Sequence, residues 1–170
     1  MTGDAKLISM PSVSVSRRIS ASADDVWAAL ADIESARRWN AAWSAIEITS
    51  TQRHGVGMTF RTHNESGDAY EFEVVDWSRG QRIAYAPVRE PGERYGINLE
   101  RHVFDIRPSD DNATHVQLTA VASTSGLRAR FVALLFWPGY QKQGLSAALE
   151  ALAAALEPPG EHPEEPVSDE

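Results

Sequence analysis

The chain of 170 residues is long enough for one domain with a packed core, because 42% of its residues are hydrophobic. It contains no cysteine, which excludes disulfides and thiolate metal sites, and its net charge of −8 argues against binding to nucleic acid. It has no apolar run of 18 residues and no signal peptide at its start, so we expect a cytoplasmic protein without a membrane span.

The first part of the chain predicts a strand followed by two short helices. Residues 1–11 are expected to form a flexible leader, and residues 12–20 alternate apolar and polar side chains as a half-buried strand does. Ser22 is placed to cap a helix over residues 23–30, where two aspartates favour the positive end of the helix dipole. A second short helix is predicted over residues 33–39.

The middle of the chain predicts strands in quick succession. Turn signals such as the one at residues 78–81 separate them, and strands joined by short turns pair antiparallel with their neighbours. The six expected strands are 44–52, 56–63, 69–78, 81–87, 95–107 and 113–124.

The last part predicts one long helix over residues 127–156, with a buried stripe of leucines at helical spacing. Pro138-Gly139 lies inside it, and because proline removes a backbone hydrogen bond, we expect a kink or break there. Residues 157–170 hold six acidic residues, four prolines and no Lys or Arg, which predicts a disordered tail and leaves residues 1–156 with a net charge of −2.

Several motifs fit this order of elements. They are Ile19 to Leu30 with Val26-Trp27 at its centre, Asp32 with Trp39, Gly55-Val56-Gly57-Met58, Asn112 to Val116, and the Leu-rich final helix. On these motifs the chain resembles the START-like (SRPBCC) superfamily over about residues 12–156, and within it the polyketide cyclase/dehydrase-like ligand-binding proteins.

The resemblance implies an α+β helix-grip fold. In that fold a curved antiparallel sheet of about seven strands wraps around a long C-terminal helix, with two short helices after the first strand. It also implies a cavity between sheet and helix that takes a small hydrophobic or polycyclic molecule, but it does not imply which one. No cofactor is expected, and the sequence does not predict an oligomeric state.

The ligand-binding candidates are apolar and aromatic residues on the strand faces and around the final helix. Periodicity alone does not separate core positions from cavity positions, so plain packing remains the alternative, above all for the tryptophans. Tyrosines are of interest because a buried hydroxyl requires a partner. The candidates are Trp39, Trp43, Met58, Phe60, Tyr70, Phe72, Tyr85, His102, Phe104, Phe131, Leu135 and Tyr140.

No catalytic or metal motif is present. None of the five histidines has a metal-binding spacing, so no metal site is predicted. His102 shares the strand phase of Phe104, and Glu100 shares that of His102. A carboxylate–imidazole pair can act as a general base, although a structural histidine is the alternative.

Three functions therefore stay open. The first is binding, transport or sequestration of a small hydrophobic molecule, and the second is an aromatase/cyclase-type enzyme acting on polyketides. Both predict a cavity of about a few hundred cubic ångströms, and they differ in whether titratable groups meet inside it. The third is a co-chaperone-like interaction module, which predicts a small interior and a large exposed apolar patch.

Overall fold

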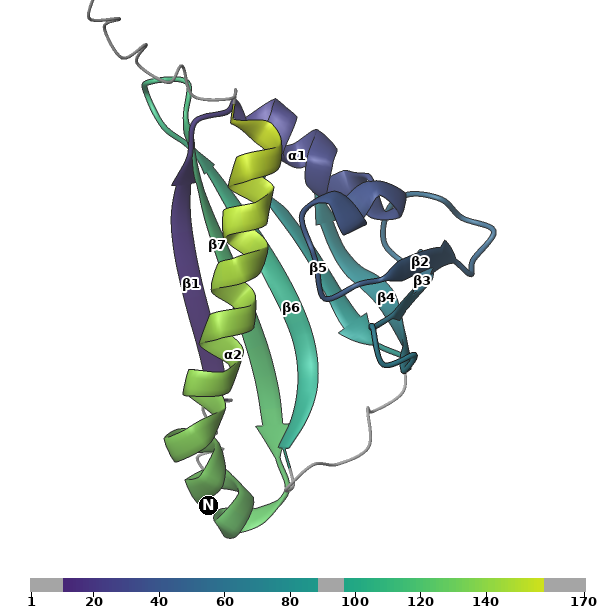
Figure 1. Ribbon diagram of the computed structural model, residues 1–170, viewed down its shortest axis with the longest axis vertical. Helices are drawn as coiled ribbons and strands as arrows, with labels where there is room; N and C mark the ends of the chain where they lie inside the picture. The colour runs from purple at the N-terminus through teal and green to yellow at the C-terminus, as the bar shows by residue number, and fades with distance from the viewer. Residues whose placement is uncertain (1–10, 89–96, 158–170) are drawn as a thin grey trace, which may run out of the picture.

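A seven-stranded antiparallel sheet, in the order β1-β7-β6-β5-β4-β3-β2, curls around one long helix in the computed structural model (Figure 1). The structure describes residues 11–88 and 97–157, apart from the side chains at 127–130, 132–134, 136 and 140. The strands are β1 (Ser12–Ile19), β2 (Ala45–Ile48), β3 (Thr59–His63), β4 (Ala69–Ser78), β5 (Arg82–Pro87), β6 (Ile97–Pro108) and β7 (Thr114–Thr124). The helices are α1 (Ala23–Ala31), the 3-10 helix η1 (Ile33–Arg38) and α2 (Gly126–Leu156). The predicted helix-grip architecture is confirmed.

The two short helices begin where the sequence predicts. The backbone N–H of Asp25 donates to the Ser22 hydroxyl at 3.1 Å, so Ser22 caps α1. Asp32 ends α1 and is also the N-cap of η1, because its side chain accepts a hydrogen bond from the N–H of Ser35. The indole N–H of Trp39 then donates to the carbonyl of Ala29 at 3.3 Å, which fixes η1 against α1.

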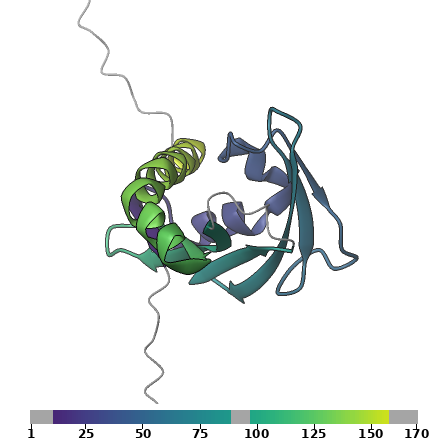
Figure 2. The ribbon, with the colours of Figure 1, turned by 90° about the horizontal axis from the view of Figure 1, so that it is seen from below.

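The sheet bends at two β-bulges. The register shifts in β4 between Val74 and Asp76, and in β6 between Leu99 and Arg101. An extra residue on one strand kinks it and increases the local twist. Seen along the molecule, the sheet curls so that α2 and the far strands face each other across the interior (Figure 2).

The second strand is shorter than predicted. Residues 44–52 show the alternation of a strand, yet β2 ends at Ile48. The Ser50 hydroxyl donates to the carbonyl of Gln52 at 2.6 Å and accepts from the N–H of Thr59 at 3.0 Å. The N–H groups of Thr49 and Ser50 both donate to the carbonyl of Thr59, at 2.9 and 3.3 Å, so the regular ladder ends here and the Ser50 side chain adds its own bonds.

Helix α2 rests on the sheet through the C-terminal half of its apolar stripe. Leu145, Leu149, Leu152 and Ala153 are buried, and they belong to the same core cluster as Val13 and other residues of β1 and β7. The helix lies over β1 and β7 in Figure 1, at one side of the sheet. The strands toward β3 are therefore not covered by α2.

The expected break in α2 at Pro138-Gly139 is wrong. The helix is continuous from Gly126 to Leu156, and Pro138 is exposed. A proline removes one N–H from the ladder, and the bonds of the neighbouring residues are sufficient to continue the helix here. Its outward position also leaves the packing on the sheet undisturbed.

The predicted leader and acidic tail lie outside the described residues, apart from Pro11 and Glu157. Pro11 accepts a backbone bond from Ala122, and the Glu157 carboxylate accepts one from the N–H of Ser20 at 3.1 Å. In the ranges that are described, no helix combines the length and apolarity needed to cross a membrane.

Replacing Leu152 tests how much the fold depends on the seat of α2. Because Leu152 is fully buried, Leu152→Ala should lower the free energy of unfolding by about 2–5 kcal/mol, measured by urea denaturation. Glu150→Ala is the matched control, since Glu150 is exposed on the same helix. Equal stabilities of the two variants would contradict the proposed packing of α2 on the sheet.

Candidate functional site

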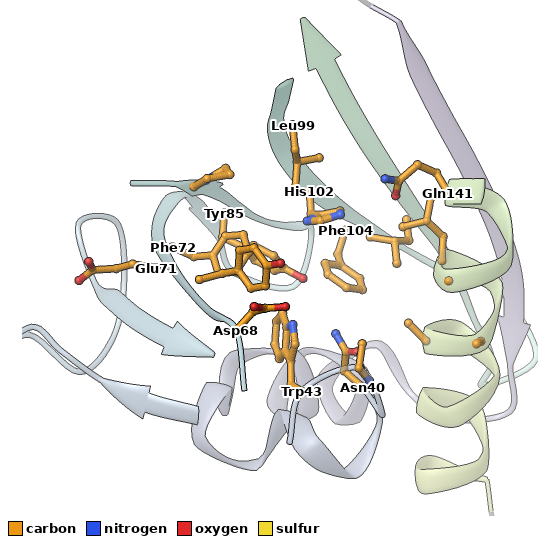
Figure 3. Close-up of a pocket in the computed structure, with 18 of the residues that line it drawn as sticks. Asn40, Trp43, Asp68, Glu71, Phe72, Tyr85, Leu99, His102, Phe104 and Gln141 are labelled. Atoms are coloured by element: carbon orange, nitrogen blue, oxygen red, sulfur yellow. The ribbon is translucent and has the colours of Figure 1, made fainter. Parts of the chain in front are cut away.

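A cavity of about 1040 Å³ lies between the curled sheet and the C-terminal half of α2. Strands β4, β5 and β6 form its floor, and the chain between η1 and β2 closes one side (Figure 3). The helix contributes small side chains at Gly144, Ala147 and Ala148, together with Gln141 and Leu145. The small side chains leave space where larger ones would fill the gap between helix and sheet.

The floor and side of the cavity form one aromatic surface. The ring of Trp43 lies 6.2 Å from that of Phe72 and 5.8 Å from that of Tyr85, and the rings of Tyr85 and Phe104 are 6.1 Å apart. Several pairs are tilted or edge-on, the arrangements that aromatic rings prefer. Phe60 packs behind them, 5.9 Å from Trp43. We call Trp43, Phe72, Tyr85 and Phe104 the aromatic wall.

Trp43 reaches the wall because the next residue is held firmly. The N–H of Ser44 donates to the carbonyl of His63 at 2.7 Å. The Ser44 hydroxyl lies 3.0 Å from that carbonyl and 2.9 Å from the carbonyl of Asn64. These bonds join the start of β2 to the end of β3, and they direct the preceding Trp43 inward.

His102 and Tyr85 bring polar groups to an otherwise apolar floor. Their rings lie 5.4 Å apart on the paired strands β5 and β6. The ring of His102 faces the cavity, while its Nδ1 atom is buried and has no hydrogen-bond partner among the described residues. Burial lowers the pKa of His102 to about 4 and raises the pKa of the Tyr85 hydroxyl well above its usual range. Both side chains are therefore neutral near neutral pH.

The predicted alignment of Glu100 with His102 is wrong, and the bulge in β6 is the reason. Leu99 pairs with Ala122 and His102 pairs with Ala120, so Leu99 and His102 share the inner face. Glu100 is the extra residue between them and does not line the cavity. Simple alternation would put Glu100 on the same face as His102. Because the bulge inserts one residue, Leu99 takes that place on the inner face.

The charged groups gather at the β3–β4 side of the cavity. Asp68 is exposed and accepts a hydrogen bond from the side-chain amide of Asn64 at 3.0 Å. Glu71 accepts one from Thr49 at 3.2 Å and points away from the aromatic wall in Figure 3. Arg61 pairs with Glu71 across the strands and therefore shares that outward face.

The structure places eleven of the twelve ligand-binding candidates, in three groups. Those on the cavity surface are Trp43, Tyr70, Phe72, Tyr85, His102 and Phe104. Those packed in the core without lining the cavity are Trp39, Met58 and Phe60. Phe131 and Leu135 are 66% and 58% exposed and do not line it, and the Tyr140 side chain lies outside the described residues.

Several lining residues were not among the candidates. Three of them lie on α2 at spacings of four and three, namely Gln141, Leu145 and Ala148. Helical periodicity places them next to the leucine stripe, so this signal could have identified them. Sequence alternation does not identify Leu99, because the bulge changes its face, and Asn40 lies in a connection without periodicity. In the described part of the chain, no three His, Asp or Glu residues gather as a metal site.

The buried neutral state of His102 predicts a pH dependence of stability. Between pH about 6.5 and about 4 the unfolded chain takes up a proton at this residue that the folded chain does not. The free energy of unfolding should therefore fall as the pH is lowered, by at most about 1.4 kcal/mol per pH unit from this group. In His102→Phe this part of the loss should disappear, as measured by urea denaturation from pH 7 to pH 4. Parallel pH profiles for the two proteins would contradict the buried neutral imidazole.

Comparison with known proteins agrees with the fold. No curated protein matches the chain. The ZhuI aromatase/cyclase from a Streptomyces species is 20% identical over 87% of this chain and 94% of its own, with a TM-score of 0.66. A START superfamily protein from Mycobacterium smegmatis is 18% identical over 86% and 99%, with a TM-score of 0.64. A hypothetical protein from Helicobacter pylori is 16% identical over 90% and 92%, with a TM-score of 0.70.

A family model matches nearly the whole described part of the chain. The family described as polyketide cyclase / dehydrase and lipid transport matches residues 10–157, which include every helix and strand described above. The solved structures at 16–20% identity add the START-like fold. The resemblance predicted from the sequence is thus confirmed, and the chain belongs to the polyketide cyclase/dehydrase and lipid transport family.

Proposed function

We propose that the protein binds a small hydrophobic or polycyclic molecule in the cavity between the sheet and α2. The observation that carries this proposal is the aromatic wall, which faces about 1040 Å³ of space instead of packing against α2. Ligand pockets usually have about 300–1,000 Å³ and are mostly apolar, with a few polar groups that orient the ligand. Tyr85 and His102 supply such groups here.

The hydrophobic effect provides the driving force for binding. A polycyclic ligand that buries about 300 Å² of apolar surface gains roughly 7 kcal/mol before the costs of association. Flat rings also stack on tryptophan and tyrosine side chains, which lose little conformational entropy on binding. The rings of Trp43 and Tyr85 are already held by their neighbours, so the binding surface is formed in advance.

A cyclase-type enzyme is the second candidate, and one observation favours it. His102 borders the cavity with a neutral imidazole, the form that accepts a proton, but burial lowers its pKa to about 4 and so makes it a weak base. Glu100 lies outside the cavity, so the carboxylate–imidazole pair that this role requires is not formed. Native mass spectrometry of a co-purified ligand separates the two candidates, because a cyclase that dehydrates its substrate releases a product lighter by one water.

A co-chaperone-like role requires a small interior, which does not agree with the cavity volume. The large apolar side chains that are exposed among the described residues come from several different elements. They are Val56, Tyr70, Val75, Val88, Phe131 and Leu135. We therefore do not propose this third function.

A pair of glycine variants on α2 tests whether the cavity is the binding site. A Cβ atom added at Gly144 or at Gly139 meets no atom within 4 Å, but only Gly144 lines the cavity. We expect Gly144→Trp to weaken binding of the naphthalene dye ANS by about tenfold, or about 1.4 kcal/mol, because the indole occupies part of the space. Gly139→Trp should bind ANS as the wild-type protein does.

Fluorescence titration gives the dissociation constants, and thermal unfolding shows whether both variants are folded. If Gly144→Trp and Gly139→Trp bind ANS equally well, the dye lies elsewhere. If the wild-type protein binds neither ANS nor any co-purified molecule, the proposed function is wrong.

A further inference from the structure

The floor of the cavity combines two polar side chains with apolar neighbours. Tyr85 is only 3% exposed, and among the described residues none forms a hydrogen bond to its hydroxyl. His102 lies beside it, with a buried Nδ1 that has no partner among the described residues. Phe104 and Leu99 flank the pair on the same face of the sheet. The Nδ1 atom is buried and out of reach of a ligand, whereas the Tyr85 hydroxyl and the other imidazole nitrogen border the cavity. These two polar groups have no partner among the described residues, so a bound molecule can supply one.

The charges around the cavity restrict what that molecule can be. Of the described residues that line the cavity, Arg61 is the only one with a positive charge. Arg61 lies on the strand face opposite the aromatic wall, where it pairs with Glu71. The carboxylate of Asp68 lies at the cavity side of β4 (Figure 3). A ligand carboxylate on the floor would therefore lose its hydration, find no cation and approach an acidic side chain.

We propose that the cavity selects a neutral oxygenated polycycle, whose hydroxyl or carbonyl group lies against Tyr85 and His102. This inference rests on the proposed function. The Tyr85 hydroxyl donates to an oxygen of the ligand, and the imidazole of His102 accepts from a ligand hydroxyl through the nitrogen that faces the cavity. The aromatic wall holds the rings. Tyr85 and His102 are thus specificity-determining residues.

The same geometry predicts rejection of two close analogues. A hydrocarbon of the same shape covers both polar groups without bonding to either, and a site built for a hydroxyl discriminates against a ligand that lacks it. A carboxylate of the same shape carries a charge that the floor does not balance. Both analogues fill the wall equally well, so any difference in affinity reports on the polar pair.

Three fluorescent probes form such a series: pyrene, 1-hydroxypyrene and 1-pyrenecarboxylate. We expect 1-hydroxypyrene to bind at pH 7 about tenfold more tightly than either analogue. Tyr85→Phe and His102→Phe should each reduce that preference by about threefold to tenfold, while pyrene binds to the variants at least as tightly as to the wild-type protein. Fluorescence titration with the full chain measures all three affinities.

His115→Phe is the matched control, since His115 is exposed on β7 and does not line this cavity. It should leave the order of the three affinities unchanged, and thermal unfolding should show that each variant is folded. If a variant at the polar pair fails to fold, Tyr85→Trp and His102→Leu provide second tests at the same two positions.

Two outcomes separate this inference from the proposed function. Equal binding of the three probes, or tightest binding of the carboxylate, overturns the selection of neutral oxygenated ligands but leaves hydrophobic binding in place. A preference for 1-hydroxypyrene that persists in both variants overturns the roles of Tyr85 and His102. Failure of all three probes to bind counts against the proposed function itself.

Discussion

The seat of α2 on β1 and β7 is the constraint on which the rest of the molecule depends. A helix with its side chains is about 10 Å across, and neighbouring strands are about 4.8 Å apart, so one helix covers about two strands. Leu145, Leu149 and Leu152 place that contact at one side of a seven-stranded sheet. The inner face of the remaining strands has to be covered by other elements, and they cover only part of that face.

The cover over the middle strands comes from α1, η1 and the chain that leads to β2. Trp39 packs edge-on against Phe104 at 5.6 Å, and Trp43 packs against Phe60 and Tyr85. These contacts join the short helices to strands outside the main contact of α2 with β1 and β7. They also pack Trp39 and Phe60 behind the aromatic wall. The free space remains where this cover and α2 do not meet.

Unpartnered polar groups in such a space lower stability, and their position indicates a use. A protein optimised only for stability would place an apolar residue at His102, next to Phe104 and Leu118. Departures from the rules of packing and hydrogen bonding concentrate at functional sites. The polar pair of Tyr85 and His102 fits that pattern, because it lies on the apolar floor of the cavity.

The sequence by itself determined the elements and their order. Alternation, the Ser22 cap and the leucine stripe act over a few residues, so they are legible without the fold, and the family resemblance added how the elements assemble. Strand periodicity also identified residues on the inner faces of the strands, among them Phe72, Tyr85 and Phe104.

Only the tertiary structure decided which of these residues face the cavity and which the core. Met58 and Phe60 have the same periodicity as the residues of the wall and are buried like Phe72, Tyr85 and Phe104, but they do not line the cavity. The bulge that replaces Glu100 by Leu99 beside His102 depends on the pairing of β6 with β7. Each of these outcomes depends on contacts between residues far apart in the chain, which local periodicity does not contain.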